Sequence, residues 1–373
     1  MKFQLVMAVW GDSYIDTMLR ATIPMLLSSG NIPALSNLSS SDITFYTRPE
    51  DERNIRDAAV VRHLQKFLAV RIAYIDPTTE KSKYNAMATA QWMAALRAQV
   101  EGAHCLMLGP DFVIADGSLA TLSRLAAAGK SAVMSYGPRL KQQAMLNILD
   151  DMRGNGSSIT ISSRQLVRLT LEHLHPESAS SFVSSDCFPH RPSFCLWPAK
   201  DGFLLRGFNL HPIMIDLSES SPIKHLDIMR TDASDGHFIG HATGRWSSIH
   251  VETDSDNFFM GSLHPTKNTH SPIASRLPVQ DTVRGMAYHT EIDPVNRSFF
   301  LQAIRIHAGD LDEDWDKVEE ESGRWAFEAL TIGRNTRGAH AFSELSFSKW
   351  NRKKRKFIRK YSKAIRSLVK RPS

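Results

Sequence analysis

The sequence predicts an α/β fold, a Rossmann-like and mostly parallel central sheet flanked by helices, with a basic helix at the C-terminus. Two observations predict the sheet. Apolar runs of strand length alternate with longer segments of helical spacing through residues 3–134, which is the order of βαβ units. Polar or acidic residues follow several of these runs, and parallel sheets bind ligands at the edge where their strands end.

The strand-like runs are apolar without a helical period, and each one ends at a polar loop. They cover residues 3–9, 43–47, 70–75, 105–108 and 131–134. Apolar residues at helical spacing predict helices between them, over residues 14–27, 58–68, 84–102 and 119–126. Two further helices are expected at 140–153 and 163–175, and further strands at 193–197, 203–207, 212–215 and 250–253.

The composition is that of a folded body with a separate basic end. Of the 373 residues, 42% are hydrophobic and 23% are charged, which excludes a largely disordered chain. The net charge is +6, but residues 349–373 contain twelve Lys and Arg and no Asp or Glu. Removing these twelve positive charges from +6 leaves −6, so the remaining body is mildly acidic.

The cysteines and the hydropathy of the chain indicate the cellular compartment. The three cysteines form no CxxC pair, which fits a reducing compartment better than a disulfide scaffold. No run of 18 apolar residues predicts a transmembrane helix. The N-terminal segment has no small-residue cleavage site, so we interpret it as a first strand and not as a signal peptide. We therefore expect a cytoplasmic protein.

The most informative segment covers residues 104–119. A buried strand ends at Gly109-Pro110-Asp111, and after an apolar step Asp116-Gly117-Ser118-Leu119 opens a helix. With Trp10-Gly11-Asp12 after the first strand and Phe45-Tyr46-Thr47 closing the second, this pattern resembles nucleotide-sugar glycosyltransferases of the A-type fold. More narrowly it is similar to bacterial glycosyltransferase-like proteins, with most of the likeness in the first third of the chain.

The resemblance implies a divalent cation and a nucleotide site. Such proteins commonly carry an Asp-x-Asp at this strand end, which holds Mg²⁺ or Mn²⁺ against the donor diphosphate. Here Gly109 replaces the first carboxylate, so Asp111 is the candidate metal ligand, and a plain turn at Pro110-Asp111 is the alternative. The resemblance places the nucleotide against the loops that contain Trp10, Gly11, Asp12, Thr47 and Asp76.

Two polar clusters in the second half are further candidates. Asp254 and Asp256 follow a predicted strand and, pointing the same way, could provide a general base or an oxygen-ligand site; the alternative is a solvated turn. Arg206, Asn209 and His211 are candidate substrate-binding residues. A catalytic carboxylate is also proposed at Asp232, against the alternative of ordinary buried histidines and exposed turns in this region.

These features together predict transfer of a sugar from a nucleotide-diphosphate donor to a lipid-linked or polysaccharide acceptor, with a divalent metal. Residues 1–138 form the expected nucleotide-sugar half, residues 139–345 the acceptor half of the same domain, and residues 346–373 the tail. The alternative is a non-catalytic binding protein anchored by that tail. The chain contains no GxGxxG after its first strand, no P-loop motif and no GxSxG.

The tail has the pattern of a basic amphipathic helix, which is typical of membrane-surface binding. Its apolar residues follow helical spacing along one face: Phe357, Ile358, Tyr361, Ile365, Leu368 and Val369. Lys and Arg fill most other positions, so we expect a peripheral protein at the anionic inner face of the membrane. A helix packed on its own domain is one alternative. Nucleic acid is another and a less favoured partner, because the chain has no nucleic-acid fold motif.

Overall fold

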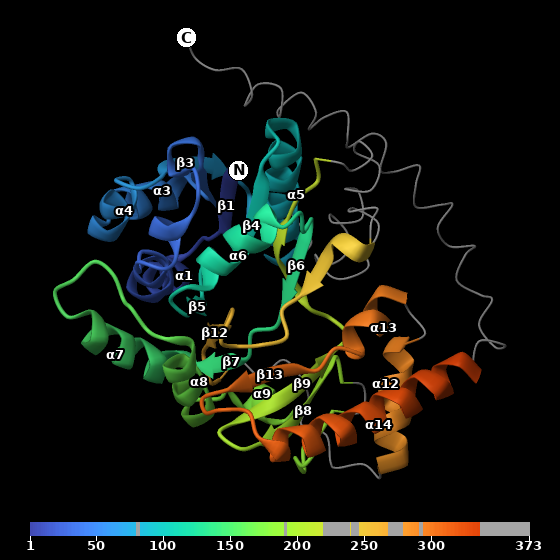
Figure 1. Ribbon diagram of the computed structural model, residues 1–373. Helices are drawn as coiled ribbons and strands as arrows, with labels where there is room; N and C mark the ends of the chain where they lie inside the picture. Colours follow the sequence, from blue (N-terminus) through green and yellow to red (C-terminus); the bar gives the residue numbers. More distant parts are fainter. Residues whose placement is uncertain are drawn as a thin grey trace.

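The computed structural model describes residues 1–79, 83–189, 192–218, 239, 246–267, 279–290 and 294–335 (Figure 1). Its centre is a seven-stranded sheet in the order β11-β6-β10-β4-β1-β2-β3, in which only β10 runs antiparallel to its neighbours. The strands are β1 (Phe3–Ala8), β2 (Asp42–Thr47), β3 (Ala69–Tyr74), β4 (His104–Leu108), β6 (Ala132–Ser135), β10 (His211–Ile215) and β11 (Ile249–Val251).

Helices cover both faces of this sheet, which explains why its central strands are apolar on both sides. In β1, Val6 and Ala8 pack in one core with α5, while Leu5 and Met7 belong to a second core with the short helices of the first 64 residues. The helices are α1 (Asp12–Thr17), a π-helical turn (Met18–Thr22), α2 (Ile23–Leu26), α3 (Glu52–Arg56), α4 (Ala59–Leu64), α5 (Lys83–Glu101) and α6 (Ser118–Ala127). Short 3₁₀ turns lie at Ile32–Ala34, Leu38–Ser40, Pro49–Asp51, Pro77–Thr79 and Trp246–Ser248.

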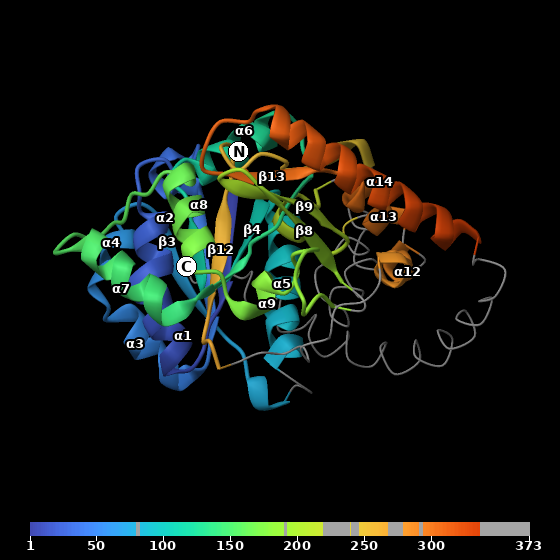
Figure 2. The same ribbon diagram turned by 90° about the horizontal axis from the view of Figure 1, so that it is seen from below.

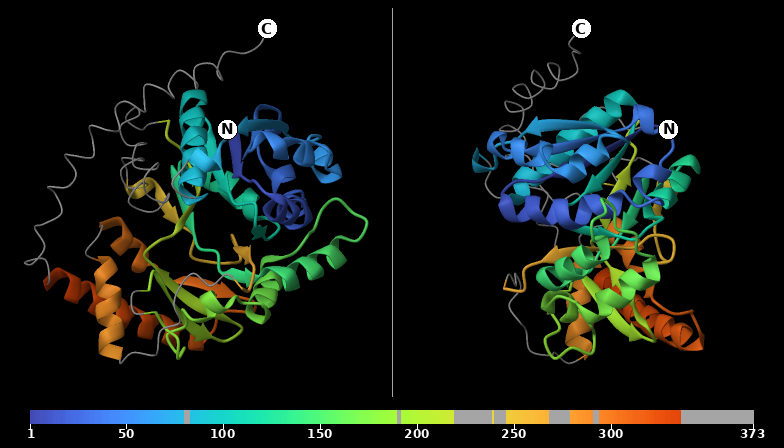
Figure 3. Two further views of the ribbon diagram at one scale, coloured as in Figure 1. Left: turned by 180° about the vertical axis from the view of Figure 1, so that it is seen from behind. Right: turned by 90° about the vertical axis from the view of Figure 1, so that its left-hand side faces the viewer.

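Two small sheets lie below the central sheet in Figure 1 and form a second lobe in Figure 3. In the first, β12 (Met260–His264) pairs antiparallel with β5 (Phe112–Ile114) and parallel with β7 (Arg139–Lys141). In the second, β9 (Gly202–Gly207) pairs antiparallel with both β8 (Phe194–Ala199) and β13 (Ile304–His307). The lobe also contains α7 (Gln142–Arg153), α8 (Ser163–Glu172), α9 (Pro176–Ala179), α12 (Val279–Thr290), α13 (Pro294–Phe300) and α14 (Glu313–Asn335).

The second lobe has an aromatic core of its own. The rings of Phe208 and Phe300 stack with their centroids 3.9 Å apart, and Trp197 and Trp315 are almost fully buried in the same cluster. The long helix α14 lies across this lobe, as the view from below shows (Figure 2). Through β10 and β11 the second half of the chain also adds two strands to the central sheet, so the two halves share that sheet.

The predicted α/β class and mostly parallel sheet are confirmed, and each predicted strand matches an observed one. The predicted helix at 14–27 corresponds to α1 and α2 joined by the π-helical turn. The strands β5, β7, β12 and β13 were not predicted. The basic tail lies outside the described residues, and among those described no helix has both the length and the hydropathy to span a bilayer.

Candidate functional site

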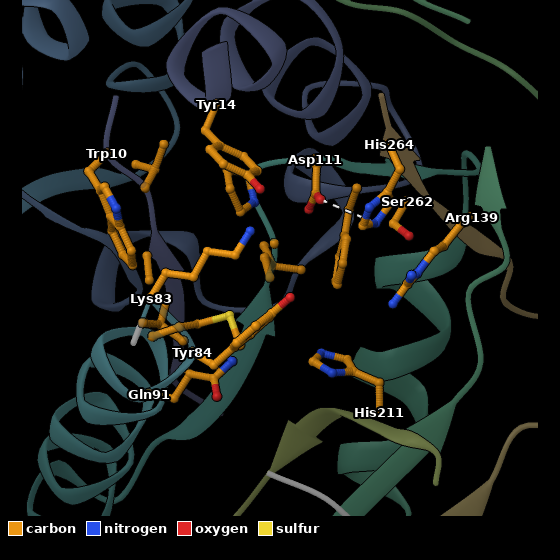
Figure 4. A pocket seen from close by; sticks show the side chains of 18 of the residues that line it. Trp10, Tyr14, Lys83, Tyr84, Gln91, Asp111, Arg139, His211, Ser262 and His264 are labelled. Carbon is orange, nitrogen blue, oxygen red and sulfur yellow. Dashed lines mark ion pairs between the residues drawn. The ribbon is translucent and has the colours of Figure 1, made fainter. Parts of the chain in front are cut away.

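A pocket of about 360 Å³ opens at the edge of the central sheet where β1 and β4 end (Figure 4). Three residues singled out by the sequence line it together: Trp10 from the loop after β1, Asp111 from the loop after β4, and His211 at the start of β10. The remaining lining is Val6, Ala8, Val9, Tyr14, Lys83, Tyr84, Met87, Gln91, Leu108, Gly109, Pro110, Phe112, Arg139, Ser262, His264 and Pro265.

The loop Gly109-Pro110-Asp111 is fixed by backbone contacts from two other elements. The Thr22 hydroxyl donates a hydrogen bond to the Pro110 carbonyl at 2.8 Å, and the Leu263 amide donates one to the Asp111 carbonyl at 2.8 Å. Gly109 has no room for a side chain, because a Cβ there would lie 2.6 Å from the Phe112 ring and 2.8 Å from Asp111 Oδ1. The absence of a side chain at Gly109 thus allows the loop to close tightly.

Asp111 and His264 face each other across the pocket wall. Asp111 Oδ2 lies 3.7 Å from His264 Nε2, and the two side chains are 15% and 22% exposed (Figure 4). His264 ends β12, which reaches this position because it pairs with β5 directly after the Asp111 loop. Burial raises the pKa of Asp111 to about 6, although Arg139 and Lys83 act in the opposite direction. A cation at this carboxylate would remove the cost of burying its charge.

Two basic side chains also line the pocket. Lys83, in the first turn of α5, extends its ammonium group into the cavity, and Nζ lies 5.3 Å from the centre of the Tyr84 ring (Figure 4). Arg139, on β7, is ion-paired with Glu177. The pocket therefore places one carboxylate among positive groups, an arrangement suited to a metal ion and an anionic ligand.

The loop that carries Trp10 is held by the segment that follows β2. The Gly11 amide donates to Asp51 Oδ2 at 3.0 Å, and Arg48 donates to both oxygens of the same carboxylate. The hydrogen bonds from Arg48 are the main reason why the pKa of Asp51 is lowered. Trp10, Tyr14 and Tyr84 then supply aromatic faces to the pocket (Figure 4).

His211 reaches the pocket because β10 is antiparallel, so its first residue lies beside the carboxyl end of β4. His211 Nε2 lies 3.0 Å from the Met107 carbonyl oxygen, and the imidazole meets the Phe112 ring edge-on at 5.5 Å between centroids. Burial lowers the pKa of His211, which favours the neutral ring.

The other residues expected to contact the nucleotide lie outside the pocket lining. Gly11 and Asp12 follow Trp10, and the Asp12 side chain is exposed. Thr47 is fully buried at the end of β2. Asp76 closes β3 by accepting hydrogen bonds from the amide and hydroxyl of Thr78. These four positions are near strand ends, as predicted, but only Trp10 of the five lines the cavity.

Arg206 and Asn209 also lie away from the pocket. The Arg206 guanidinium is buried in the second lobe, where it donates to Ser322 Oγ at 2.9 Å and to the Leu301 carbonyl at 2.8 Å. These bonds connect β9 to α14 and to the end of α13, so Arg206 has a structural role. Asn209 is exposed in the turn after β9. Of the predicted substrate-binding set, only His211 enters the pocket.

The carboxylates of Asp254 and Asp256 are engaged elsewhere. Asp254 Oδ1 lies 3.0 Å from His307 Nε2, and Asp256 forms an ion pair with Arg164 at 2.8 Å. Ligand atoms of Asp254, Asp256 and His307 lie within 4.8 Å of one another, but none of the three lines the pocket. We assign them no part in it. Asp232 lies outside the described residues.

Sequence reasoning missed His264, Lys83 and Arg139. A signal for the first was present, because Ser262 and His264 stand two residues apart around the buried Leu263, the spacing of one face of a strand. Nothing in the sequence alone indicates that β12 pairs with β5, since the two strands are separated by almost 150 residues.

No family model and no curated protein matches this sequence. Among solved structures, Staphylococcus aureus TarS 1–349 in complex with UDP is 10% identical over 94% of this chain and 78% of that chain, with a TM-score of 0.35. The mannosyltransferase PcManGT from Pyrobaculum calidifontis, in complex with GDP-Man and Mn²⁺, is 10% identical over 98% and 84%, with a TM-score of 0.33. In S. aureus TarS itself the match spans 22% of that chain and 37% of this one, at 12% identity and a TM-score of 0.23. Identities and TM-scores this low establish no activity for this chain.

Proposed function

We propose that the pocket binds a nucleotide-diphosphate sugar and transfers the sugar to a hydroxyl acceptor, with a divalent cation held by Asp111 and His264. The observation that carries this proposal is the 3.7 Å separation of Asp111 Oδ2 and His264 Nε2. Oxygen and nitrogen ligands lie about 2.1 Å from a divalent metal, so two atoms about 3 to 4 Å apart can share one ion. One carboxylate and one imidazole leave coordination positions for diphosphate oxygens and water.

The chemistry required of such a site is stabilisation of a leaving diphosphate. A bound Mn²⁺ or Mg²⁺ supplies Lewis-acid stabilisation of the negative charge. The ammonium group of Lys83 adds positive charge from the side of α5, and Arg139 adds it from β7. In a partly desolvated pocket these fixed charges act more strongly than in water, because the local dielectric constant is lower.

The shape of the pocket fits a nucleotide or sugar ring. Its volume of about 360 Å³ lies in the range of small-molecule sites. Trp10, Tyr14 and Tyr84 offer flat apolar faces of the kind on which bases and sugar rings pack, and Gln91 adds a polar group deeper along α5. A glycan or lipid-linked acceptor is the partner that the basic tail supports, since such a tail would hold the protein near a membrane.

Metal-dependent donor binding tests the proposal. The full-length protein is screened by thermal shift against UDP, GDP, CMP and dTDP sugars, with and without Mn²⁺. We expect one donor to stabilise the protein only when Mn²⁺ is present. Asp111→Asn should abolish that shift, whereas Asp57→Asn, the same change at an exposed position just after α3, should leave it intact.

Two results would contradict the proposal. The first is that no nucleotide sugar stabilises the wild-type protein, which would favour the alternative of a non-catalytic binding protein. The second is that Asp111→Asn retains the full Mn²⁺-dependent shift, which would remove the cation from this carboxylate. A donor that binds but never releases its nucleoside diphosphate in the presence of glycan acceptors would also favour the non-catalytic alternative.

A further inference from the structure

We propose that His211 is the general base of this transfer, and that the reaction inverts the configuration of the anomeric carbon. The inference rests on the proposed function, because it assigns the residue that accepts the acceptor's hydroxyl proton. It also gives the stereochemical outcome, which neither the sequence nor the cation site determines.

The position of His211 is set by the fold. It begins β10, the one strand among the described residues of the central sheet that runs antiparallel to its neighbours, so it emerges beside the carboxyl end of β4 with its side chain in the pocket. Figure 4 shows it across the cavity from Asp111 and His264.

Hydrogen bonding fixes the tautomer of His211. Its Nε2 lies 3.0 Å from the Met107 carbonyl oxygen, which can only accept, so Nε2 carries a proton and donates it. In a neutral ring the lone pair is then on Nδ1. Among the described residues Nδ1 has no hydrogen-bond partner, so it is available to a hydroxyl group of a bound acceptor.

The surroundings of the ring favour its neutral form. The edge-on Phe112 ring covers one side, and burial lowers the pKa of His211. The ionisable groups that share the pocket with it are Asp111, His264, Arg139, Lys83, Tyr14 and Tyr84. A histidine that is neutral near pH 7 can accept a proton from a hydroxyl group.

The other proton acceptors in the described part of the pocket have a different task. Asp111 and His264 are the proposed cation ligands, and a coordinated group cannot also act as the base. Outside the pocket, Asp254 is paired with His307 and Asp256 with Arg164. This leaves His211 as the group among the described lining residues with the lone pair and the position that the step needs.

The step balances without any additional reactant. The acceptor O–H bond breaks and its proton moves to Nδ1 of His211, while the acceptor oxygen forms a bond to the anomeric carbon. The bond from that carbon to the diphosphate oxygen breaks, and its electron pair leaves with the diphosphate. Attack from the side opposite the leaving group inverts the anomeric configuration, and the imidazolium afterwards returns its proton to water.

The test compares wild-type protein with His211→Gln, whose amide can keep the bond to Met107 but cannot accept the proton. We expect kcat to fall by about 10² to 10⁴-fold, with the Mn²⁺-dependent thermal shift by the donor and the donor KM unchanged. Added imidazole should partly restore turnover of His211→Ala. NMR of the wild-type product should show the anomeric configuration opposite to that of the donor.

Each contrary outcome has a separate meaning. A retained configuration in the wild-type product, or near-wild-type turnover of His211→Gln, overturns the inference and leaves the proposed function standing. Loss of turnover in Asp232→Asn while His211→Gln stays active assigns the base to that carboxylate instead. A wild-type protein that binds no nucleotide sugar overturns both proposals. The configuration of the wild-type product requires no variant, so a retained configuration overturns the inference even where a variant unfolds.

Discussion

The Asp51 carboxylate accepts a hydrogen bond from the Gly11 amide at 3.0 Å, which ties the loop after β1 to the segment after β2. Arg48 donates to the same carboxylate at 2.7 and 3.0 Å, so the group is held from two sides. Gly11 has a φ of 80°, a left-handed conformation that a glycine adopts without strain. Since Trp10 directly precedes Gly11, these bonds fix the position of an aromatic wall of the pocket.

Asp51→Ala should therefore affect both stability and donor binding. The carboxylate is only 4% exposed, and its removal leaves the Gly11 amide without its acceptor and Arg48 without its bidentate partner. We expect the free energy of unfolding to fall by about 1 to 3 kcal/mol in urea titrations, and the donor KM to rise. The control is Glu50→Ala, an exposed carboxylate 3.3 Å from Arg48, which should change neither quantity. An unchanged donor KM in Asp51→Ala would separate this clamp from the pocket.

The pair Asp111 and His264 should behave as one unit in a double-mutant cycle. If both hold one cation, Asp111→Asn or His264→Gln alone should lower kcat by a hundredfold or more, on the order of several kcal/mol of transition-state stabilisation. The double variant should then lose little more than either single variant. Turnover at a saturating Mn²⁺ concentration is the measurement. If the fold-losses in kcat of the two single variants multiply in the double variant, the two side chains act independently.

Gly109→Ala should damage the site more than the fold. The new Cβ would meet the Phe112 ring at 2.6 Å and Asp111 Oδ1 at 2.8 Å, so the Asp111 carboxylate must move. We expect Mn²⁺ affinity and turnover to fall at least tenfold, because a ligand displaced by about 1 Å no longer fits the ion. Gly102→Ala is the matched control, since its Cβ meets nothing within 4 Å and its φ of 59° costs only backbone strain. Equal loss of activity in both variants would point to a general loss of stability.

Much of the first half could be predicted from the sequence, because local signals determine it. Strands such as Phe3–Ala8 are buried on both faces and are therefore apolar throughout, and polar loops mark their ends. The same reasoning found Trp10 and Asp111, since each follows directly after a strand that the pattern identifies. His211 was found as part of a polar cluster, but its place in an antiparallel strand was not foreseen.

The rest of the site depends on pairings between distant segments. His264 comes beside Asp111 only because β12 adds to β5, a contact that no local pattern reports. Arg206 shows the converse error: an arginine after a strand suggested substrate binding, yet its guanidinium serves three carbonyls and a hydroxyl inside the second lobe. Asp254 and Asp256 were correctly seen as a close pair, but their partners, His307 and Arg164, come from distant segments.

The ion pair of Asp254 and His307 should make stability depend on pH. The hydrogen bond with Asp254 raises the pKa of His307 above 6.5, and that with His307 lowers the pKa of Asp254 below 3.8. Because the pKa of His307 is raised on folding, its protonation adds to the free energy of unfolding below pH 6.5. This stabilisation is lost as the pH rises through the folded-state pKa of His307. Because the pKa of Asp254 is lowered on folding, its ionisation adds to the free energy of unfolding above pH 3.8. This stabilisation is lost as the pH falls through the folded-state pKa of Asp254.

The stability difference between wild type and Asp254→Asn should thus be largest between pH 3.8 and 6.5 and should shrink at higher pH. Urea unfolding at about pH 5.5 and about pH 9 measures it. Asp310→Asn serves as the control, because this exposed carboxylate pairs with Arg164, which stays charged over this range, so its effect should change little. A difference for Asp254→Asn that is the same at both pH values would show that His307 is not protonated in the folded protein.

Deletion of residues 349–373 should release the protein from anionic vesicles while sparing the pocket. The segment contains twelve Lys and Arg and no acidic residue, and each cation near an anionic leaflet is worth about 1 kcal/mol. Binding of the full-length chain to phosphatidylserine vesicles should therefore weaken steeply with salt, and neutral vesicles should bind far less.

The control is a full-length variant with the tail residues in scrambled order. It keeps the charge but disperses the apolar face formed by residues such as Phe357, Tyr361 and Ile365, so we expect it to bind with intermediate strength. The deleted protein should keep its turnover on a soluble acceptor. A full-length protein that ignores anionic vesicles at low salt would refute the membrane role.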